Sequence, residues 1–240
     1  MTQDDSRRFP WFLLVSTLAA LVVLISLGNW QVRRLAWKEN LLATIETRIN
    51  AAPVPLAEAL ALGGDAIEYL PVTIEGVFLA DTEQHVLSTW KGVSGWHIYQ
   101  PLETAGGVVF VNRGFVPYDR KEPATRPDSL PVGPQTITGL ARMPLSEKPG
   151  ALVPDNAPDM NQYYWKDLSA MTVAAGLTGF DVVAVFVDAG PYDDPAALPV
   201  GGVTNIDLPN NHLQYAVTWY GLALALSGVA GAFLWRRSRA

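Results

Sequence analysis

The sequence predicts two transmembrane α-helices flanking an α+β, mainly antiparallel β, extracytoplasmic domain. Two long apolar stretches without charged residues lie near opposite ends of the 240-residue chain, and each reaches the roughly 20 residues that cross a bilayer as a helix. Between them, short β-rich runs are separated by Gly, Pro and Asp clusters, which is the pattern of a strand-dominated domain. We therefore expect transmembrane helices at 9–32 and 212–235 and a domain at 36–209.

The first apolar stretch runs without a charge from Phe9 to Val32. Arg7 and Arg8 precede it and resemble the basic start of a cleavable signal peptide. The stretch is too long for such a peptide, however, and it does not end in a small-x-small cleavage site. We interpret it as a retained transmembrane helix.

The segment between the two stretches predicts short elements in a regular order. Apolar residues keep near-helical spacing from Leu35 to Asn50 without Gly or Pro, so a helix is expected to continue out of the membrane. A short second helix is expected from Leu56 to Leu62. The runs expected to form strands are 69–79, 85–90, 96–102, 108–115 and 136–142, whose spacing favours antiparallel pairing, and one more at 182–188. A further helix is expected at 166–175, and loops are expected at 123–134 and 188–209.

The composition of the segment 36–209 limits the possible functions. It carries 10 Lys and Arg against 21 Asp and Glu, which argues against a nucleic-acid partner, because phosphates need a basic footprint. The chain has no cysteine, so disulfides, thiol chemistry and copper delivery through thiolates are excluded. Enzyme signatures are also missing, since there is no G-x-S-x-G, P-loop or H-E-x-x-H sequence. His85 and His97 fall on expected strands and are assigned no role.

Basic residues at the end of the second apolar stretch indicate its orientation. Arg236, Arg237 and Arg239 close this stretch, whereas no Lys or Arg lies between Lys166 and Leu213. The Arg-rich end is expected to face the cytoplasm. With two spans, both termini are then cytoplasmic and the domain lies outside.

His212 stands out because it lies at the extracytoplasmic edge of the second span. It is expected in the first turn of the helix, with Asn210 or Asn211 available as the N-cap. The positive end of the helix dipole disfavours imidazolium, and a neutral imidazole is the form that binds a metal. The placement suits an axial ligand for haem iron, with Tyr215 and Trp219 as aromatic walls on the same face.

A simpler interpretation is that His212 only anchors the span at the interface, while Tyr215 and Trp219 pack against the first span. The residue chemistry alone favours it, because ionisable groups near the membrane centre, more than at its edge, mark function. A stripe of small residues, Ala223, Ser227 and Gly231, is expected to pack against the first span or a partner's helix.

Three stretches carry a resemblance to a known family. They are Leu27-Gly28-Asn29-Trp30-Gln31-Val32-Arg33-Arg34 with Trp37-Lys38, Val111-Asn112-Arg113-Gly114-Phe115-Val116-Pro117, and Asn210-Asn211-His212-Leu213-Gln214-Tyr215-Ala216-Val217-Thr218-Trp219-Tyr220-Gly221. Together they resemble the surfeit-locus family of cytochrome c oxidase assembly factors, in its bacterial form, and the resemblance spans the whole chain.

This resemblance implies a role in maturing the haem-copper catalytic subunit of a terminal oxidase in the bacterial cytoplasmic (inner) membrane, with the middle domain periplasmic. It implies haem a as cofactor, with His212 as the iron ligand and Tyr215 and Trp219 as weaker candidates for the pocket. The implied partners are the catalytic subunit of cytochrome c oxidase, haem a synthase and membrane lipid. No enzyme activity is expected. For Arg113, a structural role in the strand-turn is favoured over contact with a partner or a haem propionate.

Two alternatives stay open. One is a scaffold or chaperone that stabilises the oxidase subunit without touching a cofactor. The other is an enzyme in which the acidic domain acts on an unknown substrate, and this would need converging carboxylates in a cleft.

Overall fold

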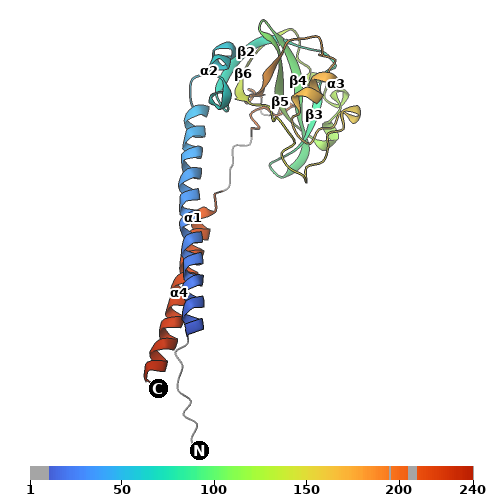
Figure 1. The fold of residues 1–240 in the computed structure, drawn as a ribbon. Helices are drawn as coiled ribbons and strands as arrows, with labels where there is room; N and C mark the ends of the chain where they lie inside the picture. The colour runs from blue at the N-terminus through green and yellow to red at the C-terminus, as the bar shows by residue number, and fades with distance from the viewer. Residues whose placement is uncertain (1–10, 195, 205–209, 240) are drawn as a thin grey trace, which may run out of the picture. The chain divides into compact units, whose positions relative to one another are not determined.

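The computed structural model describes residues 11–194, 196–204 and 210–239. Two compact units make up the chain (Figure 1). One is helical and contains most of α1 (Trp11–Ile49) together with α4 (His212–Arg239). The other is a domain formed by Ile45–Ile206 and built around a β-sheet. The expected fold class is confirmed.

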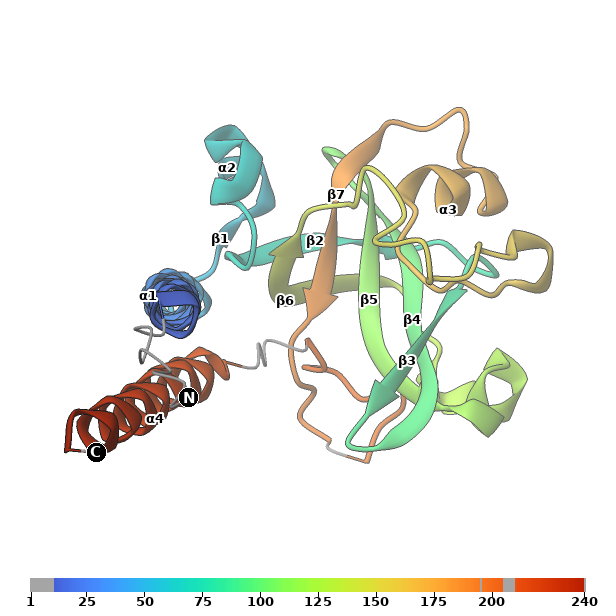
Figure 2. The same cartoon turned by 60° about the horizontal axis from the view of Figure 1, so that its bottom comes forward.

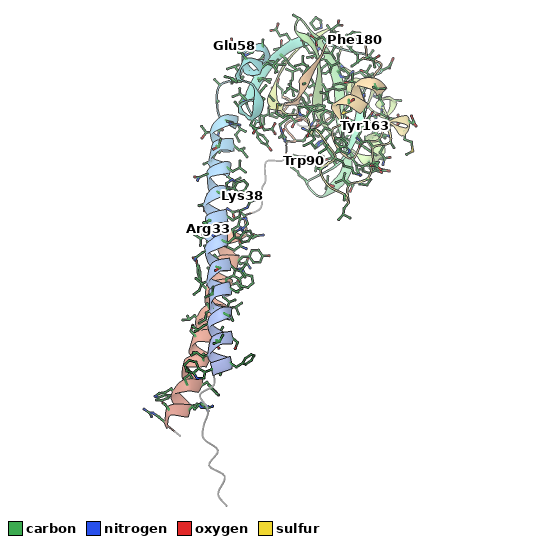
Figure 3. All side chains as sticks on the ribbon, in the orientation of Figure 1. Arg33, Lys38, Glu58, Trp90, Tyr163 and Phe180 are labelled. Atoms are coloured by element: carbon green, nitrogen blue, oxygen red, sulfur yellow. The ribbon has the colours of Figure 1, made fainter. Side chains whose placement is uncertain are left out.

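Helices α1 and α4 are each long and apolar enough to cross a membrane. α1 has 39 residues, or about 58 Å at 1.5 Å per residue, which exceeds the thickness of a bilayer core. The helix expected from Leu35 is therefore the continuation of the first apolar stretch, without a break. Arg33 and Lys38 lie on this continuing part of α1 (Figure 3).

The sheet has seven strands in the order β1-β2-β6-β7-β5-β4-β3, with an additional pairing between β2 and β4 (Figure 2). This pairing closes β2, β6, β7, β5 and β4 into a ring. The strand bounds are β1 Val54–Pro55, β2 Pro71–Phe78, β3 Gln84–Trp90, β4 Val93–Thr104, β5 Gly107–Pro117, β6 Pro134–Arg142 and β7 Val182–Ala189. The six expected strands are confirmed, whereas β1, only two residues long, was missed.

The sheet combines antiparallel and parallel pairings. Among the runs expected to be antiparallel, β2–β6, β3–β4 and β4–β5 pair in that way. The later strand β7 is antiparallel to β6 but parallel to β5, and the short β1 runs parallel to β2. A parallel pair needs a long crossover, and here the chain passes through β6 and α3 (Leu168–Ala174) between β5 and β7. The sequence did not predict the direction of β7, because that direction depends on the path of this long connection.

The remaining helices are short. α2 (Leu56–Leu62) and α3 confirm the two expected short helices, and the Asp167 side chain caps α3 by accepting from the N–H of Ala170 at 3.0 Å. Single 3₁₀ turns occupy Gly64–Ala66, Tyr118–Arg120, Pro123–Thr125, Pro127–Ser129 and Pro158–Met160. Two of them lie within the expected loop 123–134.

The apolar core of the domain consists of two main clusters on opposite faces of β5. Val109 and Val111 belong to one cluster, whereas Val108 and Phe110 belong to the other, because successive side chains of a strand alternate. β5 is therefore buried on both faces. The buried Tyr163 adds a single bridge to the free edge of β3 (Figure 3).

Candidate functional site

His212 is the first residue of α4 and makes a direct contact with α1. Its ring nitrogen Nδ1 lies 2.7 Å from Oε1 of Gln31. An amide oxygen can only accept a hydrogen bond, so this contact requires the proton on Nδ1. In the neutral imidazole, the other ring nitrogen, Nε2, then carries the lone pair, which is the form that ligates a metal.

The start of α4 fixes the position of the imidazole. Asn211 occupies the N-cap position, because its carbonyl oxygen accepts from the N–H of Tyr215 at 3.2 Å. Asn210 Oδ1 is buried and accepts no hydrogen bond from any residue that the structure describes. One ring nitrogen and one amide oxygen are thus left for a ligand at this helix end.

A second contact joins the same two segments two turns further along α4. The hydroxyl of Tyr220 donates to Oδ1 of Asn29 at 2.7 Å. Gly28 packs under the ring of Tyr220, since a Cβ at this position would lie 2.6 Å from a ring carbon. Two of the stretches that carry the family resemblance, taken from opposite ends of the chain, therefore meet in the helical unit.

The face of α4 that packs on α1 includes some of the expected site residues and excludes others. Ala216, only 2% exposed, and the partly buried Trp219 lie on this face together with His212. Tyr215 is 54% exposed within the helical unit, so it does not pack on α1. The structure brings Trp219 and His212 to one face and leaves Tyr215 at its border.

The expectation that the stripe of small residues packs against α1 is wrong. Ala223 is buried, but Ser227 and Gly231 are exposed. A spacing of four residues drifts by about 40° per step around a helix with 3.6 residues per turn, so the stripe rotates away from the contact. The face that is actually buried alternates steps of four and three residues.

Sequence reasoning missed Gln31 as the partner of His212, and it missed the contact of Asn29 with Tyr220 that pairs the two helices. The available signal was the presence of two amide side chains in an otherwise apolar span, because a polar group in such a place needs a partner. Nothing in the sequence identified that partner, since Gln31 and His212 are 181 residues apart.

The third stretch of the resemblance builds a buried charge cluster in the domain. The pairing of β4 with β5 skips one residue, so that Arg113 bulges between Asn112 and Gly114. The Arg113 guanidinium donates to Glu83 at 2.8 Å and to Gln100 at 2.9 Å. Burial of this arginine in an ion pair agrees with the structural role favoured for it.

Arg126 completes the cluster from the 3₁₀ turns that follow β5. It forms a two-pronged ion pair with Glu83, to both carboxylate oxygens. Burial alone would raise the pKa of Glu83, but the side chains of His85 and Arg126 and the charge of Arg113 outweigh it and lower the pKa to about 2. Glu83 is therefore a fixed anion that holds two cations.

A cavity of about 410 Å³ lies beside this cluster, and Glu83 and His85 are among its lining residues. The carboxylate of Glu83 is already engaged by two arginines, and its low pKa makes it a poor general base. Among the residues that the structure describes, no group of three or more His, Asp or Glu side chains is placed to hold a metal ion. Glu83 is therefore not available as a catalytic base at this cavity.

Comparison with known proteins agrees with the family resemblance that the three stretches carry. The family model described as SURF1 family matches residues 18–224. The chain is 34% identical to Surfeit locus protein 1 of Mus musculus over 250 residues, which cover 97% of this chain and 76% of that protein. It is also 34% identical to Surfeit locus protein 1 of Homo sapiens, covering 97% and 78%, and to the SURF1-like protein of Drosophila melanogaster, covering 98% and 79%. The chain belongs to the SURF1 family.

Proposed function

We propose that this protein is a membrane-bound assembly factor for cytochrome c oxidase that binds haem a through His212 and assists its insertion into the catalytic subunit. Family membership supports the assembly role. The observation that carries the cofactor is the Nδ1 contact of His212 with Gln31, because it leaves Nε2 free as a ligand.

The residues at the start of α4 fit such a group. A bound haem would supply an iron that a neutral imidazole can ligate. His212 would hold the iron, the exposed ring of Tyr215 and the partly buried Trp219 would meet apolar parts of the porphyrin, and the free Oδ1 of Asn210 would accept from a polar substituent. The apolar flanks of both helices suit a hydrophobic cofactor.

The proposed location follows from the charges at the end of α4. Arg236, Arg237 and Arg239 lie in its last turn, and by the positive-inside rule they support a cytoplasmic position for that end. On this proposal, His212 lies at the outer edge of the bacterial inner membrane, and the domain is periplasmic. Haem a synthase as donor and the oxidase catalytic subunit as acceptor are the partners of this proposal.

Replacing His212 by Ala is expected to remove haem from the purified protein. Loss of the iron ligand should weaken haem binding by more than the roughly 10- to 100-fold that follows from loss of a residue hydrogen-bonded to a metal ligand. Protein purified in detergent from cells that make haem a would be compared by its reduced-minus-oxidised spectrum and its haem content. Gln214→Ala, at an exposed position about 200° around α4 from His212, is the matched control and should keep its haem.

Equal haem content in the His212→Ala variant and the parent would refute the ligand assignment. Absence of haem from the parent and the variant alike would favour the cofactor-free scaffold. In that case, oxidase assembly in cells should be insensitive to the His212→Ala substitution.

A further inference from the structure

Gln31 lies in an unusual position for an amide side chain. It sits near the end of the first apolar stretch and is only 8% exposed. Burying an amide in apolar surroundings is unfavourable unless its polar atoms are paired. The side-chain oxygen of Gln31 pairs with Nδ1 of His212 at 2.7 Å. The hydrogen bond between the Tyr220 hydroxyl and Asn29 has the same length.

The contact selects one of the two neutral forms of the imidazole. A free neutral histidine side chain favours the proton on Nε2, which would block that nitrogen as a ligand. The Oε1 atom of Gln31 instead requires the proton on Nδ1. In metal sites, the nitrogen that does not bind the metal commonly donates to such an acceptor, which fixes the tautomer and the orientation of the ring.

We propose that Gln31 is a positioning residue for His212: it holds the Nδ1–H tautomer and presents Nε2 as the iron ligand. This inference rests on the proposed haem function. Because Gln31 belongs to α1 and His212 to α4, the ligand nitrogen is correctly presented only while the two helices are paired. Binding of the cofactor is thereby coupled to the integrity of the helical unit.

The residue that contacts the His212 ring is a neutral amide, not a carboxylate, and this affects how firmly the iron would be held. A carboxylate in this place would make the imidazole more electron-donating and would hold ferric iron more firmly, because charge-assisted hydrogen bonds are stronger than neutral ones. An amide orients the ring with a weaker electronic effect. This suits a protein that must release the cofactor to an acceptor.

The first test measures the tautomer in the absence of haem. Full-length protein carrying ¹⁵N-labelled histidine would be studied by NMR in lipid nanodiscs, with the His212 signal assigned by its loss in His212→Ala. The parent is expected to show protonated Nδ1, and Gln31→Leu is expected to shift towards protonated Nε2. Tyr220→Phe is the matched control, because it removes the other 2.7 Å contact between the helices and leaves Gln31 in place.

The second test measures haem affinity and reduction potential in the same proteins. Gln31→Leu should bind haem roughly 10- to 100-fold more weakly than the parent, which is the usual effect of removing a residue that hydrogen-bonds to a metal ligand. Gln31→Glu keeps an acceptor oxygen and adds a charge, so it should bind ferric haem at least as tightly as the parent. Tyr220→Phe should stay close to the parent, and the reduction potential should change in Gln31→Leu alone of these two variants.

The outcomes separate the two proposals. Protonated Nε2 on His212 in the parent would overturn the role of Gln31, whether or not haem binds. Equal losses of affinity in Gln31→Leu and Tyr220→Phe would also overturn it, because helix pairing in general would then be the cause. A parent that shows protonated Nδ1 but binds no haem would leave the positioning of the ring intact and remove the proposed function.

Discussion

Replacing Glu83 by Gln is expected to destabilise the domain by about 3–5 kcal/mol, the usual result of removing one partner from a buried ion pair. The side chain of Glu83 is 4% exposed and is the anion that faces both Arg113 and Arg126. An amide cannot neutralise two buried guanidinium groups. Urea unfolding of the full-length protein in detergent, followed by near-ultraviolet circular dichroism, would measure the difference. Glu75→Gln, at an exposed position of β2, should change the free energy of unfolding by less than about 0.5 kcal/mol.

The acid dependence of stability follows from the same group. The pKa of Glu83 in the folded protein is about 2, below its ordinary value of 4.5, so the carboxylate stabilises the fold at every pH above about 4.5. This contribution is lost as the pH falls from about 4.5 to about 2. The Glu83→Gln variant should lack that part of the pH profile. An unchanged profile would show that the ion pairs seen around Glu83 do not support the fold.

Replacing Gly114 by Ala is expected to destabilise the domain by about 2–6 kcal/mol. Gly114 has φ of +130°, a region that costs other residues roughly 1–3 kcal/mol. A Cβ there would also lie 2.1 Å from the carbonyl oxygen of Val200, and such overpacking costs about 1–3 kcal/mol more. The oxygen has little freedom to move, because Phe115 and Val200 exchange two main-chain hydrogen bonds of 2.9 and 2.8 Å.

The matched control for Gly114 is Gly106, in the turn between β4 and β5. The nearest atom to an added Cβ there is the Thr104 hydroxyl oxygen at 3.9 Å. The free energy of unfolding of Gly106→Ala should therefore lie within about 0.5 kcal/mol of that of the parent. The midpoint of thermal unfolding, measured for both variants, would decide. Similar midpoints for the two variants would contradict the close approach of the 200–201 segment to β5.

The sequence by itself determined the element types, the two apolar helices and the family. Helical or alternating periodicity, apolar length and turn residues act over a few neighbouring residues, so the strands at 69–142 and the helices at 56–62 and 166–175 could be assigned locally. The same locality placed His212 in the first turn of α4. Three motif stretches, each continuous in sequence, were enough to indicate the family.

Only the tertiary structure decided which residues meet. The hydrogen bond between Gln31 and His212 joins positions 181 residues apart, and no local pattern encodes such a pairing. Which face of α4 is buried likewise depends on how α1 packs against it. Tyr215 is therefore exposed, and so are Ser227 and Gly231 of the small-residue stripe. The parallel β5–β7 pair and the bulge that directs Arg113 to Glu83 arise from long-range register. Local propensity fixes what each segment forms, whereas the contacts that create a site depend on how distant segments pack.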